Sequence, residues 1–116
     1  MKLPNADRAV VDIEKLRDYC LNPEHPRGRH KARVFASVLG LTERDAGELR
    51  AALLAAARTQ EAMAQEIDSY GQRYMLDFVM QGLVGEAAVR SGWIIRTGED
   101  FPRLTSCFVL QGRQAL

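Results

Sequence analysis

The stretch Glu86–Arg96, with the sequence EAAVRSGWIIR, decides the fold of this chain. Val89, Trp93 and Ile95 lie four and two residues apart there, as side chains on one face of a strand do. Because successive side chains of a strand point to opposite faces, this alternation predicts one long strand. One face would carry Val89, Ser91 and Trp93, and the other Arg90. We expect this strand to be central in a sheet.

Further strands are predicted on both sides of this stretch. Upstream, apolar residues alternate with others from Tyr74 to Met80, and Gly82–Gly85 supplies the turn between the two strands. Downstream, a turn leads to a strand over Arg103–Leu110 that would pair back as a hairpin. The tail Gln111–Leu116 is expected to fray. The pattern therefore predicts an antiparallel meander of three to four strands.

The N-terminal half predicts about three helices. Asp12–Leu21 begins with a capping aspartate and ends before Asn-Pro, and His30–Gly40 ends at a glycine suited to a C-cap. The third helix, Thr42–Arg58, opens on a capping-box signature and has one apolar face. The polar segment Thr59–Ser69 would either extend that helix or cross the surface as a connection.

These elements predict an α+β fold in which the N-terminal helices pack on one face of a C-terminal antiparallel sheet. The other face of the sheet would stay partly open, and there we expect function. A chain of 116 residues fits one domain, 1–116, with a core over about 3–110.

Composition narrows the class of protein further. The chain is 47% hydrophobic and 27% charged with a net charge of +1, as in ordinary folded globules. Its apolar runs are far shorter than a membrane span, and its first residues do not resemble a signal peptide, so we expect a cytoplasmic protein without membrane contact. Cys20 and Cys107 show no disulfide or zinc-site spacing, and we predict that both lie in the core, with no metal and no cofactor.

The densest polar group is the basic run Arg27–Arg33, with the sequence RGRHKAR, which leads from a loop into the second predicted helix. Unpaired backbone N–H groups at a helix start attract anions, and Arg29, Lys31 and Arg33 would add to that attraction. The run therefore predicts a phosphate-binding site. The alternative is that these side chains are solvated cations on a surface.

His30, within this run, is the residue best suited to proton transfer near neutral pH, and His25 is the other candidate. Alternatively, either histidine only forms hydrogen bonds in a loop or cap. In the sheet, Arg90 has small neighbours that leave its guanidinium room to reach a ligand. Thr105 and Ser106 would place hydroxyls on both faces of the last strand, and we predict that Trp93 is core. The motifs of the large enzyme classes are not found in the sequence.

Several segments together resemble a bacterial domain family of unknown function, whose members occur as small stand-alone proteins or as C-terminal domains of polymorphic toxins. The resemblance spans Leu3 to about Leu110. It is carried by Leu3–Ala6, Lys15–Pro23, Gly28–Phe35, Tyr70-Gly71, Trp93–Ile95 and Pro102–Thr105.

The order of helices and strands is also similar, more loosely, to the barnase, EndoU and RelE-like group of ribonuclease toxins. That resemblance implies cleavage of RNA without a metal, by residues gathered on the sheet beside a helix. It implies His30 as general acid or base, Lys31 and Arg90 on the scissile phosphate, and Thr105 as a hydroxyl contact. Arg29, Arg33 and Arg103 would bind the substrate.

Other functions fit the same residues. The chain could be a non-catalytic interaction module, such as an immunity-type or toxin-neutralising partner or a packaging-associated domain, whose cations bind an acidic protein. It could also bind RNA without cutting it, with a steep dependence on salt. The partners that we expect are therefore RNA, a cognate antitoxin or the product of a neighbouring gene.

Overall fold

The computed structural model describes residues 1–110. Its helical half contains α1 (Ile13–Lys15) with the continuing turn η2 (Leu16–Cys20), α2 (Arg29–Val34) with the continuing turn η3 (Phe35–Leu39), and α3 (Ala46–Thr59). Short turns η1 (Ala6–Arg8) and η4 (Glu43–Asp45) precede α1 and α3. The strands are β1 (Met63–Asp68), β2 (Gly71–Gln81), β3 (Glu86–Arg96) and β4 (Arg103–Val109). No helix of the described part is long and apolar enough to cross a bilayer.

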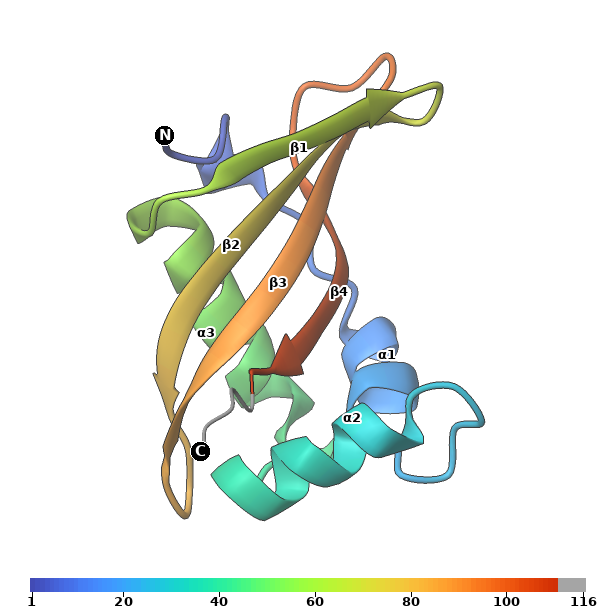
Figure 1. Ribbon diagram of the computed structural model, residues 1–116, viewed down its shortest axis with the longest axis vertical. Helices are drawn as coiled ribbons and strands as arrows, with labels where there is room; N and C mark the ends of the chain where they lie inside the picture. The colour runs from blue at the N-terminus through green and yellow to red at the C-terminus, as the bar shows by residue number, and fades with distance from the viewer. Residues whose placement is uncertain (111–116) are drawn as a thin grey trace.

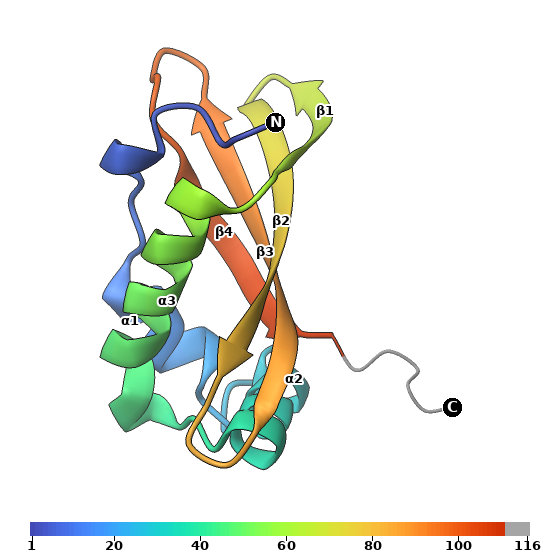
Figure 2. The same ribbon diagram turned by 90° about the vertical axis from the view of Figure 1, so that its left-hand side faces the viewer.

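The strands form one antiparallel sheet in the order β1-β2-β3-β4, so β3 is an inner strand, as predicted. Figure 1 shows this sheet from its outer face, and Figure 2 shows that α1 and α3 cover the inner face. The α+β fold predicted from the sequence is confirmed, with three N-terminal helices and a sheet of four strands. The predicted tail, Gln111–Leu116, lies outside the described residues.

The first strand lies where the sequence predicted an extended helix or a connection. Within Thr59–Ser69, α3 ends and Met63–Asp68 forms β1, which pairs with the start of β2. Every residue of β1 is exposed. Since neither of its faces is buried, no alternation of apolar and polar residues marks it as a strand.

Local sequence sets two helix boundaries as predicted. Gly40 ends the second helix with a φ of 73°, a left-handed conformation that glycine adopts without steric cost. Thr42 and Asp45 form a capping box before α3, in which the Thr42 backbone N–H donates to Asp45 Oδ2 at 2.9 Å. The third helix therefore begins at its predicted signature.

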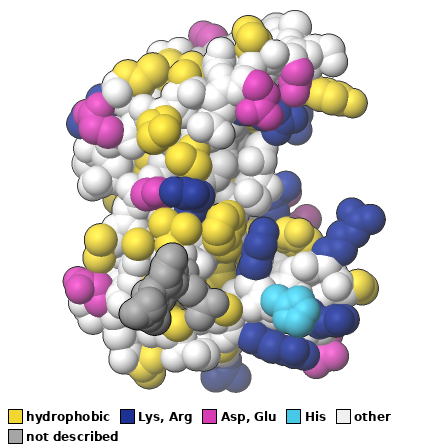
Figure 3. Space-filling model, viewed as in Figure 1, with side chains coloured by type: hydrophobic (Ala, Val, Ile, Leu, Met, Phe, Trp, Pro, Cys, Tyr) yellow, Lys and Arg dark blue, Asp and Glu magenta, His cyan; other side chains and the backbone are white. Residues whose placement is uncertain are grey.

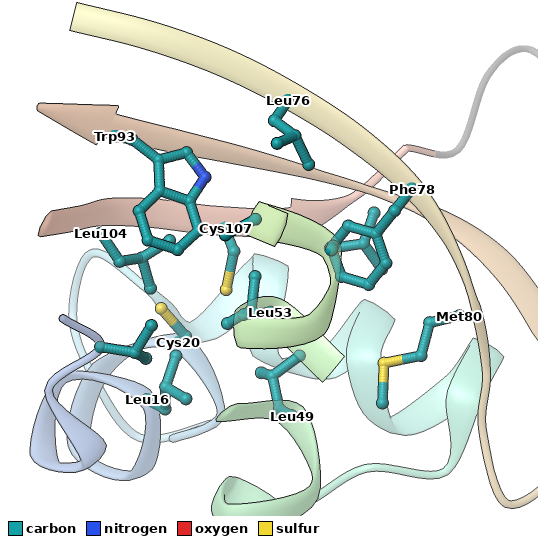
Figure 4. Close-up of a cluster of buried hydrophobic side chains, with 14 of the residues drawn as sticks. Leu16, Cys20, Leu49, Leu53, Leu76, Phe78, Met80, Trp93, Leu104 and Cys107 are labelled. Carbon is teal, nitrogen blue, oxygen red and sulfur yellow. The ribbon is translucent and has the colours of Figure 1, made fainter. Parts of the chain in front are cut away.

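The core lies between the inner face of the sheet and the helices. Figure 4 shows side chains of β2, β3 and β4 pointing toward α3 and η2, with Trp93 beside Leu104 and above Leu16 and Cys20. Cys20 and Cys107 are buried free thiols, as predicted. Full burial of a large apolar side chain is worth about 1.5–3 kcal/mol, so this cluster is what holds the helices on the sheet.

Ser91, on the inner face of β3, is a polar side chain that is fully buried. Its hydroxyl donates to the Leu76 carbonyl at 2.7 Å and accepts from Trp93 Nε1 at 2.9 Å. Ser91 thus satisfies an indole N–H that has no access to water, and the bond fixes the ring of Trp93.

Replacing Ser91 with alanine should therefore destabilise the fold. Ser91→Ala leaves the indole N–H and one acceptor position buried without a partner, a loss of about 1–3 kcal/mol in the free energy of unfolding. Denaturant unfolding followed by tryptophan fluorescence measures it. The exposed Ser37→Ala is the matched control and should change stability by less than about 0.5 kcal/mol. Equal stability of both variants would contradict a role for Ser91 in fixing Trp93.

Candidate functional site

A groove runs from the outer face of the sheet at β1, past the edge strand β4, to the loop before α2. One part, the sheet hollow, has a volume of about 210 Å³. It is lined by Gln65, Glu66, Arg73, Met75, Arg90, Gly92, Thr105, Ser106 and Phe108, among others. The second part, the basic hollow, has about 640 Å³ and is lined by Lys15, Tyr19, His25, Arg27, Thr105 and Ser106. The two hollows meet at Thr105 and Ser106, and together we call them the cross-sheet groove.

A β-bulge brings two hydroxyls to this meeting point. Gly92 pairs with Ser106 and Trp93 pairs with Leu104, so Thr105 is an extra residue in β4. A bulge of this kind re-aims side chains and occurs often beside functional sites. Thr105 and Ser106 consequently both line the groove. The sequence predicts these two hydroxyls on opposite faces, and that prediction is wrong because alternation fails at a bulge.

Gly92 provides the space for these hydroxyls. A Cβ at Gly92 would lie 2.9 Å from Thr105 Oγ1 and 3.4 Å from Ser106 Oγ. Any larger residue at position 92 would push the Thr105 hydroxyl aside. Because Gly92 has no side chain, this hydroxyl can lie over the middle of the sheet.

His25 is held in one orientation at the wall of the basic hollow. Its Nδ1 accepts hydrogen bonds from the backbone N–H groups of Arg27 at 3.0 Å and Gly28 at 3.1 Å. Its ring packs edge-on against Tyr19, with centroids 4.5 Å apart. With Nδ1 occupied as an acceptor, the neutral ring carries its proton on Nε2, which is therefore a hydrogen-bond donor to a ligand.

Gly28 makes this arrangement possible. A Cβ there would lie 2.5 Å from the Tyr19 carbonyl oxygen, closer than real contacts allow. The loop before α2 can therefore lie against the end of η2 only with glycine at this position. That approach carries His25 and Arg27 to the edge of β4.

The cations around the groove fall into two groups. Arg90, on the sheet, forms a two-pronged ion pair with Asp77, with both N···O distances at 2.9 Å. Lys15 and Arg27, in the basic hollow, form no ion pair with residues 1–110, and Lys15 Nζ contacts only the Thr105 carbonyl at 3.5 Å. The positive charge of the basic hollow is thus left for an external anion.

The helical basic run extends this charge. Lys31 reaches across β4 and places its ammonium 4.5 Å from the centre of the Phe108 ring. Arg29, His30 and Arg33 are exposed on α2. Within the described residues, none of these four side chains has an ion-pair partner. Figure 3 shows the molecule hollowed at its right-hand side, with Lys and Arg side chains gathered around a histidine below the hollow.

The structure brings together some of the predicted site residues. Arg90 and Thr105 line the sheet hollow, and Lys31 contacts Phe108, which lines it too. His30, Arg29 and Arg33 lie outside the lining of both hollows. Arg103 also lies outside it and is occupied elsewhere, since its guanidinium pairs with Glu99 at 2.9 Å and stacks on Phe101.

Four residues of the basic hollow received no individual role from the sequence, although Arg27 opens the predicted basic run: Lys15, Tyr19, Arg27 and Ser106. His25 had been only the second choice as a proton-transfer residue. The polar loop with two prolines that contains His25 and Arg27 was a usable signal, since such loops often carry function. No local pattern marks Lys15 or Tyr19, because only the packing of α1 and η2 on β4 brings them to the groove.

Comparison with known proteins adds two findings. A family model described as "Domain of unknown function (DUF6883)" matches residues 2–111. A chain in the structure of a "Contact-dependent growth inhibition toxin - immunity protein complex from Klebsiella pneumoniae 342" has a similar fold, with a TM-score of 0.69. The match covers 92% of this chain and 97% of that one at 14% identity, so it shows the fold alone. No curated protein matches the sequence.

The ion pair between Arg103 and Glu99 can be tested by measuring thermal stability at different pH values. The hydrogen bond from Arg103 holds the pKa of Glu99 below its usual range, and Glu99 in turn raises the pKa of Arg103. A lowered carboxyl pKa stabilises the fold above the unfolded-state value and loses that effect as pH falls through the folded-state value.

Glu99→Gln should therefore lower the melting temperature at about pH 7 and lower it less at about pH 3, because more of Glu99 is protonated at the lower pH. Thermal unfolding at both pH values measures the difference. Glu86→Gln is the control, because Glu86 is exposed and has no ion pair in the described part of the chain. If Glu99→Gln is neutral at both pH values, Arg103 is free to bind a ligand.

Proposed function

This chain belongs to the DUF6883 family, and from that premise we propose that it is a small domain that cuts RNA without a metal ion, with the cross-sheet groove as its site. One observation carries the proposal: a histidine held in place, two unpaired cations and two hydroxyls line the same hollow. The fold shared with a member of a toxin and immunity protein complex supports a role in such a system.

Cleavage of RNA through its own 2′-hydroxyl needs three things from a protein. A base takes the 2′-OH proton as the oxygen attacks phosphorus, cations stabilise the added charge on the phosphate oxygens, and an acid protonates the departing 5′-oxygen. We assign Lys15 and Arg27 to the phosphate, because both are unpaired within residues 1–110 and lie beside the Thr105 and Ser106 hydroxyls. The hydroxyls then donate to the same phosphate.

His25 we assign to the phosphate as a hydrogen-bond donor, because its ring is fixed by Tyr19 and two backbone N–H groups and its neutral form carries the proton on Nε2. Proton transfer stays with His30, the residue predicted from the sequence, which is exposed on the first turn of α2. The two histidines can be compared directly.

The remaining predicted residues receive supporting roles. Arg29, Lys31 and Arg33 would hold phosphates that flank the cleaved one, since α2 borders the groove and these cations are unpaired within residues 1–110. Arg90 keeps its ion pair with Asp77 and forms a wall of the sheet hollow, with Nη1 left to donate to RNA.

We expect the purified protein to cut RNA in EDTA, and His30→Ala to lower the rate by about 10²–10⁴-fold, the usual contribution of a proton-transfer residue. Gel analysis of a labelled RNA measures cleavage, and 2′,3′-cyclic phosphate ends would identify the 2′-OH as nucleophile. His25→Ala removes a hydrogen-bond donor to the phosphate, so it should lower the rate by about 10²–10³-fold and keep the pH dependence of the rate.

The outcomes separate the assignments. Loss of the pH dependence of the rate in His25→Ala but not in His30→Ala would move the proton-transfer role to His25. Arg27→Gln should weaken RNA binding and reduce its dependence on salt, whereas the distant, exposed Arg58→Gln should not. Absence of cleavage by the wild type with all tested RNAs would overturn the proposed function.

The second candidate is a non-catalytic partner in a toxin and immunity pair. The observation that favours it is the fold shared with a chain of a complex that holds both a toxin and an immunity protein, a likeness that supports either role equally. On this second hypothesis the unpaired cations of α2 and the basic hollow bind an acidic protein surface instead of RNA. As a toxin, the chain would bind its neutralising partner over the same cations.

Expression in bacteria distinguishes the two candidates. A nuclease toxin should arrest growth when produced alone, and His30→Ala should relieve the arrest by removing proton transfer. Growth curves after induction measure this, with immunoblots to confirm equal amounts of both proteins. Harmless expression of the wild type, together with a stable complex with a neighbouring-gene protein, would favour the non-catalytic partner.

A further inference from the structure

Glu66 is an unusual residue for a groove that binds an anion. It lines the sheet hollow with Arg73 and Arg90, yet it forms no ion pair with residues 1–110. Those arginines are paired with other carboxylates: Asp68 lies 3.4 Å from Arg73 and Asp77 lies 2.9 Å from Arg90. An unpaired carboxylate in this position repels phosphate, so its placement is explained better by a neutral ligand that carries hydrogen-bond donors.

The backbone aims Glu66 into the hollow. The pairing of β1 with β2 shifts between Ala64 and Ile67, so Gln65 and Glu66 together face Arg73. In a regular strand two successive residues would point to opposite faces, but here both line the sheet hollow. Gln72 Nε2 donates to the Gln65 carbonyl at 2.9 Å, which ties the bulge to β2.

The floor of the hollow suits a flat ring. Met75, Gly92 and Ser106 pair across β2, β3 and β4 and form one row on the outer face. Gly92 has no side chain and Met75 offers a polarisable thioether, a group that packs well against aromatic rings. Thr105 and Ser106 end this row at the basic hollow, where the proposed function places the scissile phosphate. A base attached to that nucleotide would therefore reach the sheet hollow.

We propose that the sheet hollow binds a guanine base of the RNA strand, with Glu66 as the group that selects it. This assignment rests on the proposed function. The Watson–Crick edge of guanine carries two adjacent donors, N1–H and N2–H, which match the two oxygens of a carboxylate. Adenine, cytosine and uracil each place an acceptor beside their donor, and that acceptor would face a carboxylate oxygen.

Two roles of Glu66, repulsion of phosphate by its charge and hydrogen bonding to guanine, predict opposite effects of Glu66→Gln on RNA binding. If Glu66 acts only as a negative charge, Glu66→Gln should tighten binding of every RNA. If Glu66 binds guanine, the variant should bind RNA that contains guanine more weakly. The guanine donor that loses its acceptor costs more binding free energy than the removal of a negative charge gains. RNA without guanine should bind the variant as tightly as the wild type, or more tightly.

The experiment compares two 2′-O-methylated hexanucleotides, which cannot be cut because the 2′-oxygen has no proton. One contains a single guanine among adenines and the other only adenines. Fluorescence anisotropy with wild type, Glu66→Gln and the control Glu86→Gln gives the dissociation constants. We expect the wild type and Glu86→Gln to prefer guanine by about tenfold or more, and Glu66→Gln to lose this preference.

Each outcome decides a separate question. Equal binding of both oligonucleotides by the wild type, no binding of either, or an unchanged preference in Glu66→Gln would overturn the guanine assignment. Guanosine monophosphate is tested in parallel, and binding as tight as that of the oligonucleotide would make a free nucleotide the ligand instead of RNA. Because the oligonucleotides cannot be cut, a guanine preference without cleavage of ordinary RNA would refute the proposed function and keep the guanine site.

Discussion

The pairing of β2 with β3 along their whole length is the constraint on which the rest of the structure depends. It runs without a bulge from Gly71 opposite Arg96 to Gln81 opposite Glu86. A slip of one residue would turn Trp93 out of the core and bring charged residues into it, so the buried face fixes the register. The same register places Arg90 opposite Asp77 on the outer face. The core and the groove are therefore set by one hairpin.

Bulges on the strands that flank this hairpin turn a regular face into a site. One lies at Gln65 and Glu66 in β1 and the other at Thr105 in β4. Each puts two successive polar side chains on the same face, which a regular strand cannot do. The inner hairpin thus supplies a rigid floor, and the outer strands supply the polar ends of the groove. Helix packing adds Lys15 and the loop that carries His25.

The pairing of cations differs between the sheet and the helical half. Three arginines of the sheet, Arg73, Arg90 and Arg103, are each paired with a carboxylate of the sheet or its turns. The cations of α1, α2 and the loop between them are largely unpaired within residues 1–110. A net charge of +1 hides this asymmetry because it is a sum. Arg90 was a reasonable candidate from sequence, but its partner Asp77 became visible only in the paired strands.

The sequence by itself determined the elements whose signals are local. Periodicity of apolar residues marked β2, β3, β4 and the helices, and the Thr42 capping box and Gly40 marked two helix boundaries. Only the tertiary structure decided β1, both bulges, and the choice of His25 over His30 as the histidine of the groove. The physical reason is that an exposed strand has no buried face to impose a pattern, while bulges, ion pairs and grooves depend on contacts between residues far apart in the chain.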